Sequence, residues 1–242
     1  PFPYTSNEIT TLHPEGHTLA GTLTVPEGDG PFACAVMITG SGMQDRDESL
    51  MGHKPFLVIA DFLTRNGIAV LRFDDRGVGG SVVEDVETLK DVTSVDFATD
   101  VSVMVDTARW QPKIDPLRVG VIGHSEGGLI GPLVAVEDDK LAFVVMLAGP
   151  GVPGYELMPV QSAMLLQASD VDQELVDGIV NASMNIYEMY QGEVDEIELR
   201  SQMMELVDLQ LITQGVKVTA NEFNEIIDDS LDQFGSPWFQ WF

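Results

Sequence analysis

A serine stands between glycines at the end of an apolar run. Residues 119–122 are apolar, and G-H-S-E-G-G follows at 123–128. A strand that ends in glycine–x–serine–x–glycine and turns at once into a helix holds its serine in a strained conformation, which needs small neighbours. The hydroxyl then lies beside a helix N-terminus, where backbone N–H groups can stabilise a developing oxyanion. This spacing predicts that Ser125 is a catalytic nucleophile; a structural serine in a glycine turn is the alternative.

Acyl transfer at such a serine also needs hydrogen-bond donors for the tetrahedral oxyanion. One donor is expected to be the backbone N–H of Glu126, the residue after the nucleophile. The second is expected in the loop that begins at residue 40, where we favour the N–H of Ser41, with Gly42 and Met43 as fallbacks. A plain tight turn is the alternative for this loop. Three further residues could line the pocket: Met43, Gln44 and His53.

The serine must be positioned by an alternation of strands and helices. A β-hairpin is expected over 8–25. Continuous apolar runs predict strands that are covered on both faces, at 33–38, 68–73, 119–122 and 141–148. Apolar residues at helical spacing predict helices at 54–65, 94–110 and 126–136. This order predicts an α/β fold, in which a mostly parallel sheet carries helices on both faces.

The sequence changes character after residue 151. Residues 155–235 contain almost no strand pattern and several amphipathic stretches. We therefore expect a core over 1–151, with the hairpin, the oxyanion loop and the serine turn, and a helical cap or lid over 152–235. The aromatic segment 236–242 is expected to lead from the cap back into the core, because it would be an awkward exposed terminus.

Composition excludes several classes of partner. The net charge is −27, and residues 151–242 hold 17 acidic and 2 basic side chains, which gives −15. Nucleic acids and anionic membranes are therefore unsuitable partners. No apolar run is long enough to span a membrane. No spaced cation loop is present, so no metal is expected, and Cys34 is the only cysteine, which excludes an internal disulfide. The compartment stays open: cytoplasmic, or exported if a leader was removed.

Charged residues cluster in the two loops that follow the first long strands. Asp74, Asp75 and Arg76 are expected to form an internal arginine–carboxylate pair. The segment 45–47, which reads D-R-D, either shapes the oxyanion loop or forms a plain surface pair, and both interpretations stay open. For His53, near the same loop, a solvent-facing position is favoured over a place in the pocket.

Four motifs in order resemble one known family. They are G-S-G-x-Q-D-R-D-E at 40–48, H-K-P-F at 53–56, L-R-F-D-D-R-G-V-G-x-S at 71–81 and G-H-S-E-G-G at 123–128. Residues 1–150 thereby resemble the bacterial carboxylesterases of the esterase D group, whose catalytic domain is classed with the serine-aminopeptidase-like α/β hydrolases. The resemblance implies an α/β-hydrolase fold, a Ser-Asp-His triad, a small-molecule ester as substrate, a helical cap and no cofactor. The cap matches more loosely, so substrate choice does not carry over.

The chain departs from this pattern in its histidines. In this fold the triad acid and base follow the serine in the chain. The four histidines are His13, His17, His53 and His124, and none follows the serine. We therefore expect the last core strands, with the triad Asp and His, to lie outside this chain, which alone should hydrolyse esters poorly. The remainder could be a separate chain, and an oligomer is possible. Two other functions stay open: a peptidase or amidase, and a non-catalytic binding module.

Overall fold

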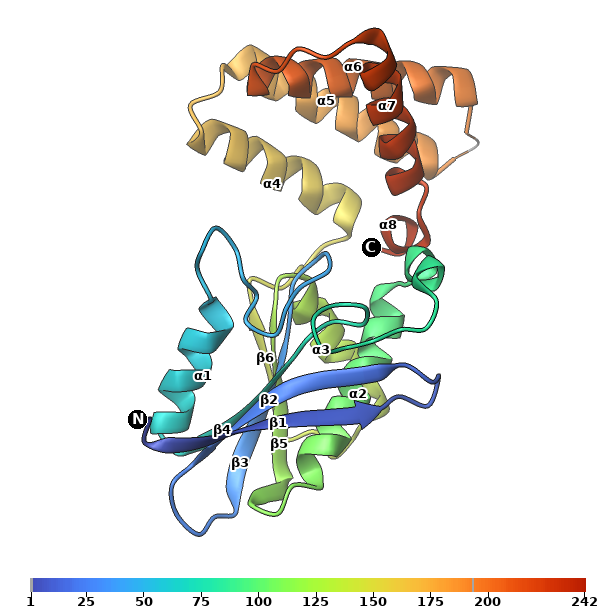
Figure 1. Ribbon diagram of the computed structural model, residues 1–242. Coiled ribbons are helices and arrows are strands. Elements are labelled where there is room, and N and C mark those ends of the chain that lie inside the picture. Colours follow the sequence, from blue (N-terminus) through green and yellow to red (C-terminus); the bar gives the residue numbers. More distant parts are fainter. Residues whose placement is uncertain (1, 193) are drawn as a thin grey trace. The chain divides into compact units, whose positions relative to one another are not determined.

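The structure is a computed structural model that describes residues 2–192 and 194–242 (Figure 1). It divides into two compact units, of which the first ends at Pro150 and the second begins at Gly151. Among the described residues, no helix combines the length and the apolar composition that crossing a lipid bilayer requires.

The first unit is built on a six-stranded sheet in the order β1-β2-β4-β3-β5-β6. Its strands are β1 (Tyr4–Leu12), β2 (Thr18–Pro26), β3 (Phe32–Ile38), β4 (Ile68–Phe73), β5 (Ile114–His124) and β6 (Val144–Leu147). The strands β4, β3, β5 and β6 are parallel neighbours, whereas β1 and β2 are joined as the predicted antiparallel hairpin. The α/β prediction with a mostly parallel sheet is therefore confirmed.

Helices cover both faces of this sheet (Figure 1). They are α1 (Pro55–Arg65), α2 (Ser94–Arg109) and α3 (Glu126–Glu137), with a short 3₁₀ helix η1 (Val86–Asp91) before α2. Strand β3 shows why its sequence is apolar throughout. Cys34, Val36 and Ile38 pack in the cluster that contains α2 and α3, while the alternate residues Ala35 and Met37 pack against α1. Alternation along a strand thus supplies two apolar faces from one continuous run.

The second unit is entirely helical. Its elements are α4 (Gly154–Ala168), α5 (Gln173–Tyr190), α6 (Glu196–Gln214), α7 (Ala220–Phe234) and α8 (Pro237–Trp241). Apolar residues at helical spacing on α5, Ile179, Ala182 and Ile186, meet Met203 of α6 and Ile227 of α7 in a separate core. The acidic side chains of this unit lie mostly on its exposed positions, as expected for amphipathic helices.

The aromatic segment at 236–242 is assigned to the second compact unit, and the expectation that it leads from the cap back into the core stays a prediction. It forms the short helix α8 within the second unit. The ring of Phe239 stacks on Tyr187 at 5.4 Å and lies 4.4 Å from Phe234, centroid to centroid. The ring of Phe239 is therefore packed against α5 and α7, whereas Trp241 of the same short helix is 39% exposed.

Candidate active site

Ser125 occupies a strained turn between β5 and α3. Its backbone has φ 52° and ψ −119°, a region that residues with a side chain rarely adopt. Two hydrogen bonds hold it there: its N–H donates to the carbonyl of Leu147 at 2.9 Å, and its carbonyl accepts from the N–H of Gly128 at 2.8 Å. A strained serine at the C-terminal end of a parallel strand is the arrangement that the motif predicts for a nucleophile.

The close packing around residue 123 explains why the motif begins with a glycine. A Cβ atom at this position would overlap the carbonyl group of Gly127 in the first turn of α3. The strand end and the helix start therefore approach each other more closely than any side chain allows. This close approach makes the turn sharp enough to place Ser125 between them.

The loop after β3, residues 39–48, lies directly beside the serine. A Cβ atom built on Gly40 would be 3.2 Å from the Cβ of Ser125. The N–H of Gly40 donates to Oε1 of Glu48 at 2.8 Å, so this N–H already has a partner. The next three residues, Ser41, Gly42 and Met43, are exposed, and within the described chain their N–H groups find no acceptor. The assignment of one of these N–H groups as an oxyanion donor stays a prediction.

Two further candidates lie next to these groups: Gln44 in the loop and Glu126 after the serine turn. Gln44 donates from Nε2 to the carbonyl of Ser41 at 3.1 Å, which ties the two arms of the loop together. Glu126 begins α3 with its side chain buried, where Oε1 accepts from the hydroxyl of Ser94 at 2.6 Å. Its backbone N–H follows Ser125 directly at the positive end of the helix dipole, which favours a negative charge.

The segment 45–47 fixes the loop to the sheet. Arg46 donates from Nε and NH2 to the two carboxylate oxygens of Asp74, at 3.0 and 2.7 Å. These hydrogen bonds to the Asp74 carboxylate raise the pKa of Arg46 above its usual value. Asp47 pairs with the buried guanidinium of Arg72 and with Lys54. The D-R-D segment thus holds the loop by paired charges to residues of β4 and the next turn.

Asp75 is a second anchor of the loop, and sequence reasoning did not single it out for that role. Its Oδ1 accepts from the hydroxyl of Thr39 at 2.7 Å, and its Oδ2 accepts from the N–H of Gln44 at 2.8 Å. Burial, with smaller contributions from the charges of Asp100 and Glu126, raises the pKa of this carboxyl to about 7. A carboxyl that spans both ends of residues 39–44 fixes their shape.

We expect the free energy of unfolding to depend on pH because the Asp75 carboxyl titrates. Because the pKa is about 7 when folded and roughly 4 when unfolded, the folded state holds the proton more tightly. The ionised carboxyl therefore costs stability as pH rises from about 4 to 7, at roughly 1.4 kcal/mol per unit of pKa difference. Asparagine can accept from Gln44 and donate to Thr39, so Asp75→Asn keeps both contacts and removes the charge.

The measurement is urea unfolding of both proteins at pH 5 and pH 8. The free energy of unfolding of the wild type should fall relative to Asp75→Asn on going to pH 8. Asp106→Asn is the matched control, because Asp106 is an exposed carboxylate of the same unit, paired only with Arg109 at 3.1 Å. Equal pH dependence of wild type and Asp75→Asn would show that Asp75 does not titrate in this range.

His53 and the other histidines lie in different surroundings. His53 is exposed, and its backbone pairs with Leu50 in a tight turn. His124 binds Oε1 of Glu48 through Nδ1 at 2.8 Å. His13 and His17 belong to the turn between β1 and β2. In the part of the chain that the structure describes, none of these four side chains hydrogen-bonds the hydroxyl of Ser125.

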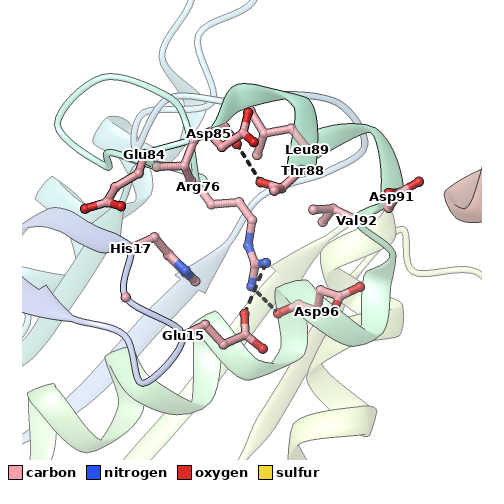
Figure 2. Close-up of a pocket in the computed structure, with 12 residues that line it drawn as sticks. Glu15, His17, Arg76, Glu84, Asp85, Thr88, Leu89, Asp91, Val92 and Asp96 are labelled. Atoms are coloured by element: carbon pink, nitrogen blue, oxygen red, sulfur yellow. Dashed lines mark hydrogen bonds and ion pairs between the residues drawn. The ribbon is translucent and has the colours of Figure 1, made fainter.

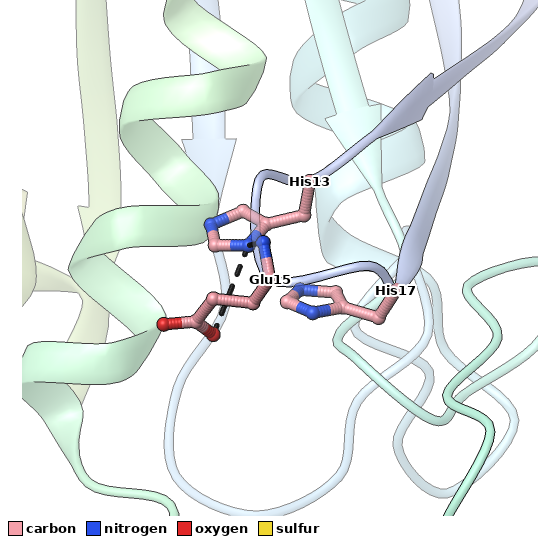
Figure 3. A group of neighbouring side chains, drawn as sticks. All are labelled: His13, Glu15 and His17. Atoms are coloured by element: carbon pink, nitrogen blue, oxygen red, sulfur yellow. Dashed lines mark hydrogen bonds and ion pairs between the residues drawn. The ribbon is translucent and has the colours of Figure 1, made fainter.

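The turn histidines form a polar cluster with Glu15 (Figure 3). His13, Glu15 and His17 bring potential ligand atoms within 4.8 Å of one another, as a metal site would. The two imidazole rings stack at 4.2 Å, however, and Nε2 of His17 bonds Asp100 at 2.7 Å. Stacked rings do not direct two lone pairs at one ion, so this geometry fits a metal poorly.

Arg76 completes this cluster as a buried ion pair. Its Nε and NH2 donate to Asp100 at 2.7 and 3.0 Å, and its NH1 lies 3.7 Å from Glu15. Arg76 therefore has a buried carboxylate partner, but this partner is Asp100 and not Asp74 or Asp75, with which the sequence grouped it. A cleft of about 500 Å³ adjoins it, lined by acidic residues of η1 and its flanks (Figure 2). None of its lining residues belongs to the serine turn or to residues 39–48, so we interpret the network as structural.

Three comparisons with known proteins agree with this geometry. The family described as serine aminopeptidase, S33, matches residues 54–203. Esterase EstD of Thermotoga maritima is 35% identical over 160 residues, which are 65% of this chain and 37% of EstD. The chain therefore spans less than half the length of this curated relative.

Solved structures show the same fold at low identity. A hypothetical protein of Pseudomonas aeruginosa, PA2218, has a TM-score of 0.51 at 19% identity, over 70% of this chain and 56% of that one. DcsB, solved with a substrate analogue, has a TM-score of 0.52 at 16% identity, over 69% and 53%. The matched family spans the helix after the loop, the serine turn and much of the second unit. The chain belongs to the serine aminopeptidase S33 family of α/β hydrolases.

Proposed function

We propose that this protein is a serine carboxylic ester hydrolase, which acts on small to medium acyl esters through an acyl-enzyme at Ser125. The observation that carries the proposal is the strained backbone of Ser125 at the end of β5, beside Gly40 of the loop at 39–48, where an added Cβ atom would lie 3.2 Å from the Cβ of Ser125. The 35% identity to an esterase supports esters as the substrate class.

The proposed reaction has two symmetrical halves. The hydroxyl oxygen of Ser125 attacks the ester carbonyl carbon while its proton passes to a base. The carbonyl electrons move to oxygen, and the oxyanion accepts from the N–H of Glu126 and from that of Ser41 or Gly42. The carbon–oxygen bond then breaks and the alcohol leaves with the proton. Water attacks the acyl-enzyme in the same way and releases the acid.

The base in this scheme is a histidine, as the family resemblance implies. The described structure commits His13 and His17 to the Asp100 network and His124 to Glu48. The expectation that the triad acid and base lie outside these 242 residues therefore stays a prediction. The experiments below accordingly use the full-length protein.

The second unit carries an apolar groove between α4 and α5. It has a volume of about 520 Å³, and its lining includes Val160, Met164, Val180, Met184 and Tyr187. Methionine side chains adapt to ligands of different shape. We propose that this groove contributes to the choice of acyl chain, in line with the cap predicted over 152–235.

A substrate panel tests this function against its alternatives. We expect p-nitrophenyl esters with acyl chains of two to about eight carbons to be hydrolysed much faster than aminoacyl p-nitroanilides. Shortening Met184 to alanine is expected to shift the preferred chain length. Faster cleavage of the anilides would favour the peptidase or amidase. Absence of turnover on every substrate would favour a binding module that keeps the fold without the reaction.

A further inference from the structure

One carboxylate oxygen joins the oxyanion loop to the serine turn. Oε1 of Glu48 accepts from the N–H of Gly40 at 2.8 Å and bonds Nδ1 of His124 at 2.8 Å. Gly40 begins the loop after β3, and His124 precedes Ser125. The same atom therefore ties together two segments that are more than 70 residues apart in the sequence.

Glu48 reaches this position through a strained backbone. Its φ is 51°, in the left-handed region, which residues with a side chain rarely adopt. A local turn maintains it: the N–H of Glu48 donates to the carbonyl of Asp45 at 2.9 Å, and Oδ1 of Asp45 accepts from the N–H groups of Asp47 and Ser49. Glu48 is buried while the next two residues are exposed. The turn thus directs one carboxylate inward.

The carboxylate of Glu48 lies where the loop at 39–48 packs against the serine turn. A Cβ atom on Gly40 would lie 3.2 Å from Oε1 of Glu48, 3.2 Å from the Cβ of Ser125 and 3.5 Å from Nδ1 of His124. The four residues are thus packed around one point. Because the N–H of Gly40 donates to Glu48, the peptide group between Thr39 and Gly40 is fixed relative to the serine, and this restricts the directions of the N–H groups that follow.

The imidazole of His124 is bound by Glu48 through Nδ1, while part of the ring faces solvent. Its side chain is 45% exposed, whereas that of Glu48 is 9% exposed. The bond to a carboxylate selects the tautomer with the proton on Nδ1, since a carboxylate can only accept. Without Glu48, both Gly40 and His124 would lose their acceptor, and the loop would be free to move from Ser125.

We propose that Glu48 is a positioning residue for the oxyanion hole, which sets the distance between the loop at 40–42 and Ser125 by holding Gly40 and His124 together. This proposal rests on the proposed function, because it assigns Glu48 a role in the same reaction. Glu48 touches neither substrate nor the reacting atoms. It acts through Gly40 and the backbone N–H groups that follow it.

Kinetics of three variants of the full-length protein test this role. Glu48→Ala should lower kcat by about 10²-fold, with KM within a few-fold, because a displacement of about 1 Å at the reacting centre has an effect of that size. Glu48→Gln should recover most of the loss, since its amide oxygen can accept from both donors. Glu8→Ala is the matched control: Glu8 contacts the same loop through Arg46 at 2.6 Å but touches neither Gly40 nor His124.

A structural readout separates this proposal from the proposed function. Nitrogen NMR should show the Nδ1–H tautomer of His124 in the wild type and in Glu48→Gln, and its loss in Glu48→Ala. An unchanged kcat in Glu48→Ala, or equal losses in the alanine and glutamine variants, would overturn the positioning role. A wild type that hydrolyses no ester would overturn the proposed function instead. If Glu48→Ala does not fold, Glu48→Asp replaces it: too short to bridge both donors, it should lower kcat at least tenfold, and full activity would overturn the role.

Discussion

Ester hydrolysis should fall by a factor on the order of 10⁴–10⁶ in Ser125→Ala, while the fold is retained. Alanine removes only the oxygen that would form the acyl-enzyme, and its Cβ occupies the same position in the turn. The backbone strain at φ 52° is common to both residues. We therefore expect urea unfolding to be within about 1 kcal/mol of the wild type and kcat to approach the background rate.

The control for this prediction is Ser102→Ala. Ser102 lies on α2, where its hydroxyl bonds the carbonyl of Ala98 at 2.9 Å, away from the reaction. This variant should hydrolyse esters at the wild-type rate. A Ser125→Ala protein that keeps a tenth or more of the wild-type kcat would show that another group forms the covalent intermediate.

Gly123→Ala should damage both the site and the fold. A Cβ atom at residue 123 would overlap the carbonyl of Gly127, which is backbone and cannot turn aside. The strand end and α3 must then separate, which moves Ser125 from the loop at 39–48. We expect kcat to fall by about 10²-fold or more and the free energy of unfolding to fall by roughly 1–3 kcal/mol. Both are measured on the same preparation, by ester turnover and urea unfolding.

Gly131→Ala provides the comparison, at a glycine inside α3, the helix that follows the serine turn. Its Cβ would meet side-chain methyl groups and no backbone, those of Val144 at 3.1 Å and Val121 at 3.4 Å, and alanine favours a helix interior over glycine. We expect its kcat and stability to remain near those of the wild type. Equal effects of the two substitutions would mean that the close approach at Gly123 has no special role.

The sequence was sufficient to predict the framework because local patterns determine it. The apolar run at 33–38 is β3, and its two faces are covered by helices on opposite sides. The helix expected at 54–65 is α1, which begins at Pro55 as the position of this proline predicts. The serine motif predicted the strand, the turn and α3, all of which depend on neighbouring residues.

The roles of Glu48 and Asp75 could not be predicted in the same way. Both act on residues that are distant in the chain: Glu48 on His124, and Asp75 on Thr39. Their positions depend on a left-handed turn and on the placing of β4 beside β3 in the sheet. The one available signal for Glu48 was its place at the end of the motif at 40–48, which the resemblance included without a role.

In the second unit, the sequence predicted the helices but not which of them pack against each other. Its helices were predicted from periodicity, but the partner of the aromatic end was not. The sequence indicates that Phe239 needs a covered position, yet only the structure shows that Tyr187 and Phe234 provide it. Apolar burial has no direction, so a pattern predicts that a side chain is buried without predicting against which element.

Covalent labelling of the active full-length protein tests the central claim most directly. A fluorophosphonate reacts with a serine that a base has activated, so peptide mass spectrometry after labelling identifies the nucleophile. We predict one modified peptide, with the phosphonyl group on Ser125, and loss of ester hydrolysis in proportion to the labelled fraction. Modification of a different serine, or full hydrolysis by protein in which Ser125 is completely labelled, would contradict the account.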